Sequence, residues 1–347
     1  MSHYEKPPEL YDGLRLHQNE NTGGCSPRVV EALRALTAEQ IAFYPPYAAA
    51  VDACARHFGI GADHLALTNG LDEGIMALSV AYLRTASADS PAEAIVPEPA
   101  FEIYRINTVV AGGTLVQIAP SPDFTLPLAH VLGAITAATR VVFLTNPNNP
   151  TGVSMPLEAI RAVARRVPPQ AVVFVDEAYA EFAGRTFLAD LPSFPNVIVG
   201  RTFSKAYGLA GLRLGCLIGA PRALEPIRPA IPVYSVNVAA VAAVRAALED
   251  RDHLQNYLRQ VAESKALLYS ACERLGLTYW KSDANFVLVC AGDRTESLVA
   301  GAAAQGVFIK DRSSEPGCAG CVRIAAGVVA HTRRCIDVLD AIISPTP

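Results

Sequence analysis

The chain has 347 residues, 51% of them hydrophobic, which is enough to bury a sizeable core in about two domains. Its net charge is −4 with no basic run, its first residues lack the apolar stretch of a secretory signal, and no apolar run approaches the roughly 18–20 residues of a spanning helix. These features exclude nucleic acid and membranes as partners, and we expect a cytoplasmic protein that acts on small molecules.

Strand-like runs alternate with helical patterns between about residues 64 and 219. The runs are HLALTN, AEAIVPE, RVVFLTN, AVVFVDE, NVIVGRT and LRLGCLIG. Between them, DEGIMALSVAYLR and MPLEAIRAVARRV carry apolar residues at three- and four-residue spacing, which is typical of crossover helices. The alternation predicts an α/β fold in which a large domain has a mainly parallel sheet flanked by helices.

The pattern changes after residue 235. An alanine-rich stretch, VNVAAVAAVRAALED, leads into a long amphipathic helix. The strands NFVLVCAG, VFIKD and CVRIAAG follow, and HTRRCIDVLDAII closes the chain as a helix. We expect this part to form a second, smaller α+β domain.

Four of the expected strands end in polar clusters. They are Asn69-Gly70, Asn146-Pro147-Asn148-Asn149, Asp176-Glu177 and Ser204-Lys205. In an open α/β sheet, the ligand crevice lies at the carboxyl ends of the strands. We therefore expect the four clusters to converge on one site.

The first two clusters allow both a structural and a chemical interpretation. Leu71 and Asp72 open a helix whose free N–H groups can hold a phosphate, although an acidic residue also simply suits a helix start. Asn149 can belong to an ordinary turn, or its amide can donate to a ligand oxygen.

The other two clusters carry charge at the end of buried strands. Asp176 can cap a helix that begins near Glu177 or can hold a buried cation, with Tyr179 in reach of the same ligand. Lys205 lies among glycines and eight positions before Arg213, a pattern that indicates a bound ligand.

As a set, these residues resemble the site of the pyridoxal-phosphate aminotransferases of the aspartate aminotransferase fold (fold type I, class II). More closely, the chain is similar to the histidinol-phosphate aminotransferases, from about Leu16 to Ile343. The similar segments follow the family's order and are HQNEN, NGLDEG, TNPNNPTG, VDEAYAEF, TFSKAYGLAGLRLG and CVRIAAG.

The resemblance implies pyridoxal 5'-phosphate as the cofactor and Lys205 as the lysine that forms a Schiff base with it and then moves a proton between Cα and C4′. Asp176 is implied to pair with the pyridine nitrogen. The implied catalytic residues are Lys205, Asp176 and Tyr179. The further coenzyme contacts that it implies are Tyr44 from a second subunit, Leu71, Asp72, Phe101, Asn149, Ser204 and Arg213. The implied substrate contacts are Asn19, Lys310 and Arg323.

The resemblance also implies an architecture and an activity. A large coenzyme-binding domain would span residues 36–244, and residues 1–35 and 245–347 would form an N-terminal arm and a small domain. The partners would be a small-molecule amino donor and a 2-oxo acid, and the assembly a homodimer with Tyr44 contributed across the interface. The implied reaction is ping-pong transfer from histidinol phosphate to 2-oxoglutarate, in histidine biosynthesis.

Several alternatives stay open. The aminotransferase can act on aromatic or varied amino acids, and a lyase similar to threonine-phosphate decarboxylase shares the lysine and the aspartate. A Rossmann dehydrogenase fits poorly, because Gly208, Gly211 and Gly215 do not have the G-x-G-x-x-G spacing. A regulator built on an aminotransferase needs an added DNA-binding domain, for which the N-terminus leaves no room.

The substrate side departs from the family's usual pattern in three places. A tyrosine usual in the family is absent from Asn19-Glu20-Asn21-Thr22-Gly23-Gly24, Lys310 precedes Asp311 where arginine is common, and Phe43 precedes Tyr44 where arginine often stands. Elsewhere, Cys318 and Cys321 form a Cys-x-x-Cys motif. No second pair exists to complete a zinc site, which favours a structural role for them, and we expect no metal.

Overall fold

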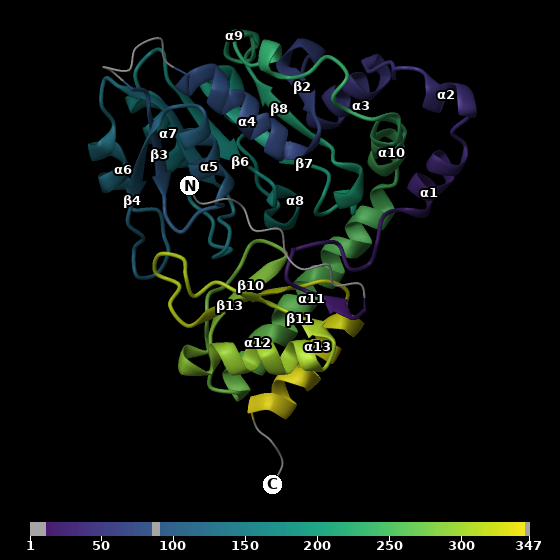
Figure 1. Cartoon of the computed structure of the whole chain (residues 1–347), viewed down its shortest axis with the longest axis vertical. Coiled ribbons are helices and arrows are strands. Elements are labelled where there is room, and N and C mark those ends of the chain that lie inside the picture. The colour runs from purple at the N-terminus through teal and green to yellow at the C-terminus, as the bar shows by residue number, and fades with distance from the viewer. Residues whose placement is uncertain (1–11, 85–90, 344–347) are drawn as a thin grey trace.

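The computed structural model describes residues 12–84 and 91–343. Residues 1–11 and 344–347 of the predicted arm and small domain lie outside the described residues. Figure 1 shows a broad part built on a large sheet and a smaller part that tapers toward the C-terminus. Within the described ranges, no helix has the length and apolar character needed to cross a membrane. The cytoplasmic location stays a prediction.

The large sheet has the strand order β2-β8-β7-β6-β5-β3-β4. All its neighbours pair in parallel except β8, which runs antiparallel to both β2 and β7. The mainly parallel sheet expected from the sequence is therefore confirmed. The strands are β2 (Leu65–Thr68), β3 (Glu93–Pro97), β4 (Thr114–Ile118), β5 (Thr139–Thr145), β6 (Val172–Asp176), β7 (Val197–Thr202) and β8 (Gly215–Gly219).

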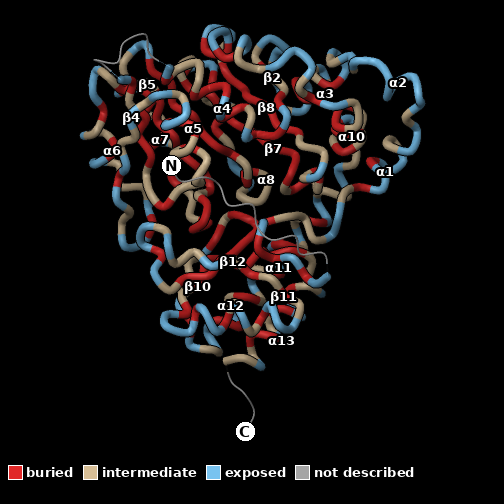
Figure 2. The backbone as a smooth tube through the Cα atoms, in the orientation of Figure 1, coloured by how far each residue is buried: buried red, intermediate tan, exposed pale blue. Residues whose placement is uncertain are grey.

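Alternate residues of the central strands enter two different hydrophobic cores, one on each face of the sheet. In β5, Val142 and Leu144 belong to one core, and Val141 and Phe143 belong to the other. The first core is covered by α1 (Pro27–Arg34), α3 (Ala48–Phe58), α6 (Leu128–Ala134), α7 (Leu157–Arg166) and α10 (Val238–Glu249). The second is covered by α4 (Gly70–Leu83), α5 (Ile103–Val110) and α9 (Pro221–Leu224). Figure 2 shows the strands running through this buried interior.

The smaller part has a four-stranded antiparallel sheet in the order β12-β13-β10-β9. Its strands are β9 (Thr278–Tyr279), β10 (Phe286–Cys290), β12 (Lys310–Asp311) and β13 (Cys321–Ala325). A separate pair joins β1 (Leu14–Arg15) to β11 (Val307–Phe308) in parallel. The core beside them contains residues of the helices α11 (Arg251–Arg274), α12 (Thr295–Ala304) and α13 (Val329–Ile343). The short helices α2 (Ala38–Ala42) and α8 (Ala180–Ala183) complete the set of α-helices in the described ranges.

The strand expected at VFIKD differs from the sequence prediction. The run VFIKD is not one strand, because Val307 and Phe308 pair with β1 whereas Lys310 and Asp311 pair with β13. The helix α10 continues through the predicted domain limit at residue 244, and Val29 of the predicted arm packs in a core of the large sheet. The division into residues 36–244, and 1–35 with 245–347, stays a prediction.

Candidate active site

A pocket of about 860 Å³ lies between the carboxyl ends of the central strands of the large sheet and the strands β12 and β13. Residues 17–20 of the N-terminal segment close it on another side. Residues of three strand-end clusters therefore line one pocket, together with Leu71 and Asp72, which directly follow the fourth cluster. The predicted site residues that line the pocket are Asn19, Leu71, Asp72, Phe101, Asn149, Asp176, Tyr179, Ser204, Lys205, Arg213, Lys310 and Arg323.

Lys205 follows β7 and reaches into the pocket. Its Nζ donates a hydrogen bond to the carbonyl oxygen of Gln18 at 3.0 Å. Burial, with the positive charge of Arg323 as the next cause, lowers the pKa of Lys205 from 10.5 to about 8. An amine with this pKa is partly neutral near pH 7, so it can act as a nucleophile and as a base.

Asp176 ends β6 and is buried at the pocket wall. Its Oδ1 accepts from the N–H of Ala178 at 2.9 Å, and its Oδ2 accepts from the hydroxyl of Tyr104 at 2.6 Å. Burial raises the pKa of Asp176 to about 6, and no basic side chain among the described residues forms an ion pair with it. The helix α8 begins at Ala180 with Tyr179 as its N-cap, so Asp176 is not the cap that its sequence position allowed.

Asn149 and Tyr179 each accept a hydrogen bond from a residue outside the large sheet. Arg323 donates from Nη1 to the Asn149 Oδ1 at 2.5 Å, and Asn19 donates from Nδ2 to the Tyr179 hydroxyl at 3.0 Å. The first contact occupies the acceptor atom of the Asn149 amide. The orientation therefore makes the amide nitrogen the group available as a donor to a ligand.

The first turn of α4 forms the opposite end of the pocket. Gly70 has a positive φ of 77°, and a Cβ added there would lie 2.5 Å from Arg213 Nη2. A Cβ on Gly215 would lie 2.6 Å from the backbone nitrogen of Leu71. The two glycines therefore allow Arg213 and β8 to approach the first turn of α4 closely. In that turn, the N–H groups of Leu71 and Asp72 have no acceptor within the helix. Together with Arg213, they make up the α4 cradle, a group of hydrogen-bond donors suited to an anion.

The small sheet supplies further cations. Lys310 lies directly opposite Arg323 in the register of β12 and β13. Arg323 also donates from Nη2 to the carbonyl of His17 at 2.7 Å, and its guanidinium lies 5.4 Å from the centre of the Phe286 ring. The pocket therefore has cationic groups at both ends, Arg213 at one and Lys310 and Arg323 at the other. Lys205 and Asp176 lie between these ends.

The sequence model of the family described as aminotransferase class I and II matches residues 11–339. The chain belongs to the class I and II aminotransferases. The histidinol-phosphate aminotransferase of Symbiobacterium thermophilum is 38% identical over 96% of this chain and 91% of its own. That of Roseobacter denitrificans is 34% identical over 94% and 90%. The solved structure of histidinol-phosphate aminotransferase from Sinorhizobium meliloti, in complex with pyridoxal-5'-phosphate, has a TM-score of 0.85 and 28% identity, with 96% of this chain and 91% of that chain covered.

These similarities confirm the family, the fold class and the enzyme class expected from the sequence: the chain is a pyridoxal-phosphate-dependent aminotransferase. The groups that line the pocket also fit the coenzyme chemically. Asp176 is a buried carboxylate that lacks a cationic partner among the described residues, and a protonated pyridine ring supplies one. The glycine-built cradle at Leu71 suits a phosphate.

Tyr44 is the predicted site residue that does not line the pocket of this aminotransferase chain. Its side chain is 73% exposed and stacks on the ring of Tyr234 at 4.0 Å between centroids. Phe43 and Ile41 beside it are exposed as well. The contribution of Tyr44 to the site of a second subunit stays a prediction.

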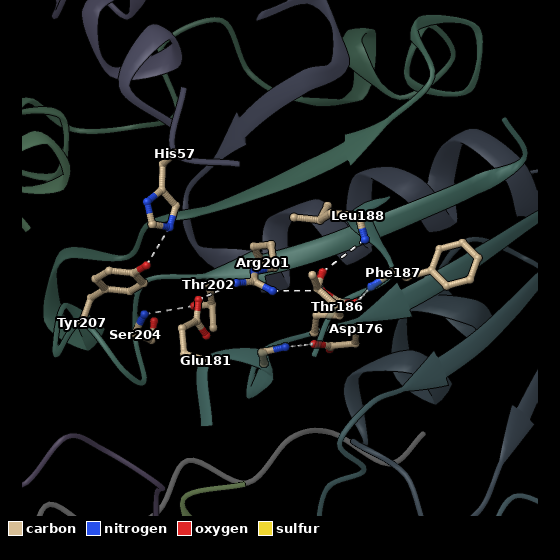
Figure 3. A network of polar contacts seen from close by, with 12 residues as sticks. His57, Asp176, Glu181, Thr186, Phe187, Leu188, Arg201, Thr202, Ser204 and Tyr207 are labelled. Atoms are coloured by element: carbon tan, nitrogen blue, oxygen red, sulfur yellow. Dashed lines mark hydrogen bonds and ion pairs between the residues drawn. The ribbon is translucent and has the colours of Figure 1, made fainter. Parts of the chain in front are cut away.

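A buried ion cluster supports the strand ends from outside the pocket. Arg201, in β7, donates from Nη1 to Glu177 at 2.9 Å and from Nη2 to Glu181 at 2.6 Å. Figure 3 shows Arg201 and Glu181 of this network, with Asp176 and Ser204 nearby. Glu177 therefore does not line the pocket, although it belongs to one of the four polar clusters; it follows β6 and pairs with Arg201 of β7.

The sequence prediction missed several residues that line the pocket. Tyr104 lies on α5, and Phe101 lies three positions earlier, just before the helix. This helical spacing could have indicated that Tyr104 lines the pocket with Phe101. Arg312 and Glu315 form an ion pair in the loop after β12. No pattern in the sequence places this loop beside the pocket. The other missed lining residues include His17, Gln18, Glu20, Thr145 and Thr202.

Cys318 and Cys321 are free thiols in a small hydrophobic cluster with Phe124 and Leu288. Burial raises the pKa of both thiols to about 12, which makes them poor nucleophiles. Within residues 12–84 and 91–343, no group of three or more His, Cys, Asp or Glu side chains is placed to hold a metal ion.

Proposed function

We propose that this aminotransferase transfers the amino group of histidinol phosphate to 2-oxoglutarate, giving imidazole acetol phosphate and glutamate in histidine biosynthesis. The observation that carries the proposal is one pocket with two anion-binding ends, the α4 cradle and the Arg323 side. A coenzyme phosphate needs the first end and a substrate phosphate or carboxylate needs the second. The names of the curated relatives support the same substrate.

The residues in the middle of the pocket carry the chemistry. Pyridoxal phosphate, when bound, supplies an aldehyde that combines with amines and a ring that withdraws electrons. Lys205 would hold the coenzyme and, as a neutral amine, would take a proton from the substrate Cα and deliver it to C4′ of the coenzyme. Asp176 would pair with the ring nitrogen, and Asn149 and Tyr179 would bind the ring oxygen; protein contacts already orient all three side chains.

The coenzyme phosphate binds in the cradle. The N–H groups of Leu71 and Asp72 and the side chains of Ser204 and Arg213 would bind its oxygens, and Phe101, which also lines the pocket, would stack on the pyridine ring. Arg213 donates to Asp72 at 2.8 Å, which holds the guanidinium at the helix start.

The other end of the pocket binds the substrate anion. The planar fork of Arg323 can bind either a carboxylate or a phosphate with two hydrogen bonds, so one residue serves both substrates of the ping-pong cycle. Lys310 adds a point charge beside it that favours the doubly charged phosphate, and Asn19 holds Tyr179 next to the substrate.

We also propose that the enzyme is a homodimer in which Tyr44 of one subunit reaches the coenzyme phosphate of the other. The exposed aromatic and aliphatic side chains Ile41, Phe43, Tyr44 and Tyr234 support this, because such side chains on one surface are typical of an interface.

Separate measurement of the two half-reactions tests the substrate assignment. We expect rapid amino transfer from both glutamate and histidinol phosphate. Arg323→Ala should slow both half-reactions. Lys310→Ala should weaken the binding of histidinol phosphate by roughly 1–3 kcal/mol and the binding of glutamate much less. Turnover of phenylalanine with no reaction of histidinol phosphate would replace this function by an aromatic aminotransferase.

A further inference from the structure

Tyr104 is a fully buried side chain that none of the roles above uses. Its ring stacks on Phe143 with 4.8 Å between centroids and meets Phe101 edge-on at 6.0 Å. Its hydroxyl donates to Asp176 Oδ2 at 2.6 Å. Tyr104 therefore contacts both the carboxylate proposed for the ring nitrogen and the ring proposed to stack on the pyridine face.

The direction of the hydrogen bonds around Tyr104 follows from the number of protons. A tyrosine hydroxyl has one proton, and Tyr104 gives it to the Asp176 carboxylate. Thr145 Oγ1 lies 2.9 Å from the same hydroxyl, so Thr145 is the donor in that contact. All three side chains are buried, and each bond in such a chain strengthens the next.

The Tyr104 hydroxyl lowers the pKa of Asp176, whereas acidic groups near Asp176 raise it. Asp72 from α4 and the neighbouring Glu177 are acidic and raise the pKa of Asp176, as burial does more strongly. The Tyr104 hydroxyl and the N–H of Ala178 are the two donors that oppose this. Of these, the tyrosine hydroxyl can be removed without changing the backbone.

We propose that Tyr104, oriented by Thr145, is a positioning residue that keeps the Asp176 carboxylate ionised and directed at the bound coenzyme ring. The inference rests on the proposed coenzyme site and adds to it a residue that does not itself touch the ring nitrogen. Tyr104 fixes Oδ2 and the Ala178 N–H fixes Oδ1, so the carboxylate has one orientation before the coenzyme arrives.

The test measures pyridoxal phosphate binding to the full chain freed of coenzyme, by equilibrium dialysis over a range of pH. In Tyr104→Phe, loss of the donor should raise the pKa of Asp176, so the affinity should begin to fall at a pH about one unit higher than in the wild type. At a pH of about 5.5, we expect roughly tenfold weaker binding, and at a pH of about 9, nearly equal binding.

Tyr82→Phe is the matched control. Tyr82 is also a tyrosine whose hydroxyl donates a hydrogen bond, at 2.9 Å to the carbonyl of Ala223, but it does not line the pocket. Its variant should keep the wild-type pH profile. Thr145→Val provides a second variant if Tyr104→Phe does not fold, and it should shift the profile in the same direction by a smaller amount.

Two outcomes would overturn the inference: a wild-type pH profile in Tyr104→Phe, or a loss of affinity that is equal at every pH and so reports damaged packing alone. A wild-type protein that does not bind pyridoxal phosphate would instead refute the coenzyme site itself. The two failures are therefore distinguishable.

Discussion

Burial gives Lys205 a chemistry that a surface lysine lacks. Its pKa is lowered to about 8 because the pocket removes water from the ammonium group and Arg323 repels it. Lys265 is a useful comparison, because burial lowers its pKa too and it also donates to a backbone carbonyl, that of Ser282 at 2.6 Å. Lys265 differs in that it does not line the pocket and that the negative charge of Asp283 raises its pKa, whereas Arg323 lowers that of Lys205.

We predict that borohydride reduction of the enzyme with bound coenzyme labels Lys205, as found by peptide mapping. Lys205→Ala should lose catalysis by a factor on the order of 10³ or more, because nucleophile and base are removed together. Lys265→Ala should stay active. A label on another lysine would show that the assignment of Lys205 is wrong.

We also predict a pH dependence for Lys205 in the coenzyme-free protein. An amine reacts only when neutral, so its rate of modification by an amine-directed reagent should rise as the pH increases through about 8. Mass spectrometry of modified peptides measures this rate for each lysine. A midpoint near the ordinary value of 10.5 would contradict the effect of burial.

At the level of residues, the sequence predicted the strand-end side chains best. Asn149, Asp176 and Lys205 follow apolar strands, and parallel strands bring such positions to one edge. Tyr104 and Arg312 could not be placed in the same way, because one depends on which helix face packs on the sheet and the other on how a loop of the small part lies against it. The chemical roles of all these residues stay predictions.

At the level of elements, the connection between β7 and β8 brings together two residues that we propose as coenzyme contacts. Because β8 runs back antiparallel to β7, Ser204 and Arg213 lie on one loop, closed by a hydrogen bond from Phe203 N to Leu214 O at 3.1 Å. Gly215 begins β8 against the first turn of α4. The loop and the helix start are therefore in close contact.

We predict that Gly215→Ala weakens coenzyme binding and destabilises the fold by about 1–3 kcal/mol, because its Cβ would lie 2.6 Å from Leu71 N. Gly211→Ala is the control in the same loop, since a Cβ there meets nothing within 4 Å. Dialysis and urea denaturation measure the two effects. Equal behaviour of the two variants would contradict the steric explanation.

The buried cluster of Arg201, Glu177 and Glu181 makes a second prediction for the elements. Arg201→Met leaves two buried carboxylates without their cation and should cost about 3–5 kcal/mol of unfolding free energy. The exposed pair of Arg185 and Asp283 provides the control, and Arg185→Met should cost at most about 1 kcal/mol. Urea denaturation that gives the same loss for both would show that the cluster does not tie β6 to β7.

Most elements of the large sheet were predictable because their strands are continuous apolar runs buried on both faces. The strand β4 was not predicted, since it lies at the edge of the sheet and its residues Thr114 and Gln117 are exposed. The division of VFIKD between two sheets depends on the pairing partners β1 and β13, which local sequence does not reveal.

For the whole molecule, we predict a homodimer with shared active sites. A hybrid of one Lys205→Ala subunit and one Tyr44→Ala subunit would contain one site with both residues intact, if Tyr44 acts across the interface. Mixing the two variants should therefore restore activity above that of either alone. Sedimentation checks the assembly, and a hybrid without restored activity would contradict the shared site.

The two ends of the pocket belong to different parts of the chain, and this affects how the enzyme can change over evolution. Lys310 and Arg323 lie within a single short segment from β12 to β13, whereas Lys205, Asp176 and the α4 cradle belong to the large sheet and its helices. Substitutions at well-separated sites generally have additive effects. Within residues 310–323, changes at positions other than Arg323, which hydrogen-bonds Asn149 and lowers the pKa of Lys205, can therefore select a new amino donor and leave the coenzyme chemistry intact.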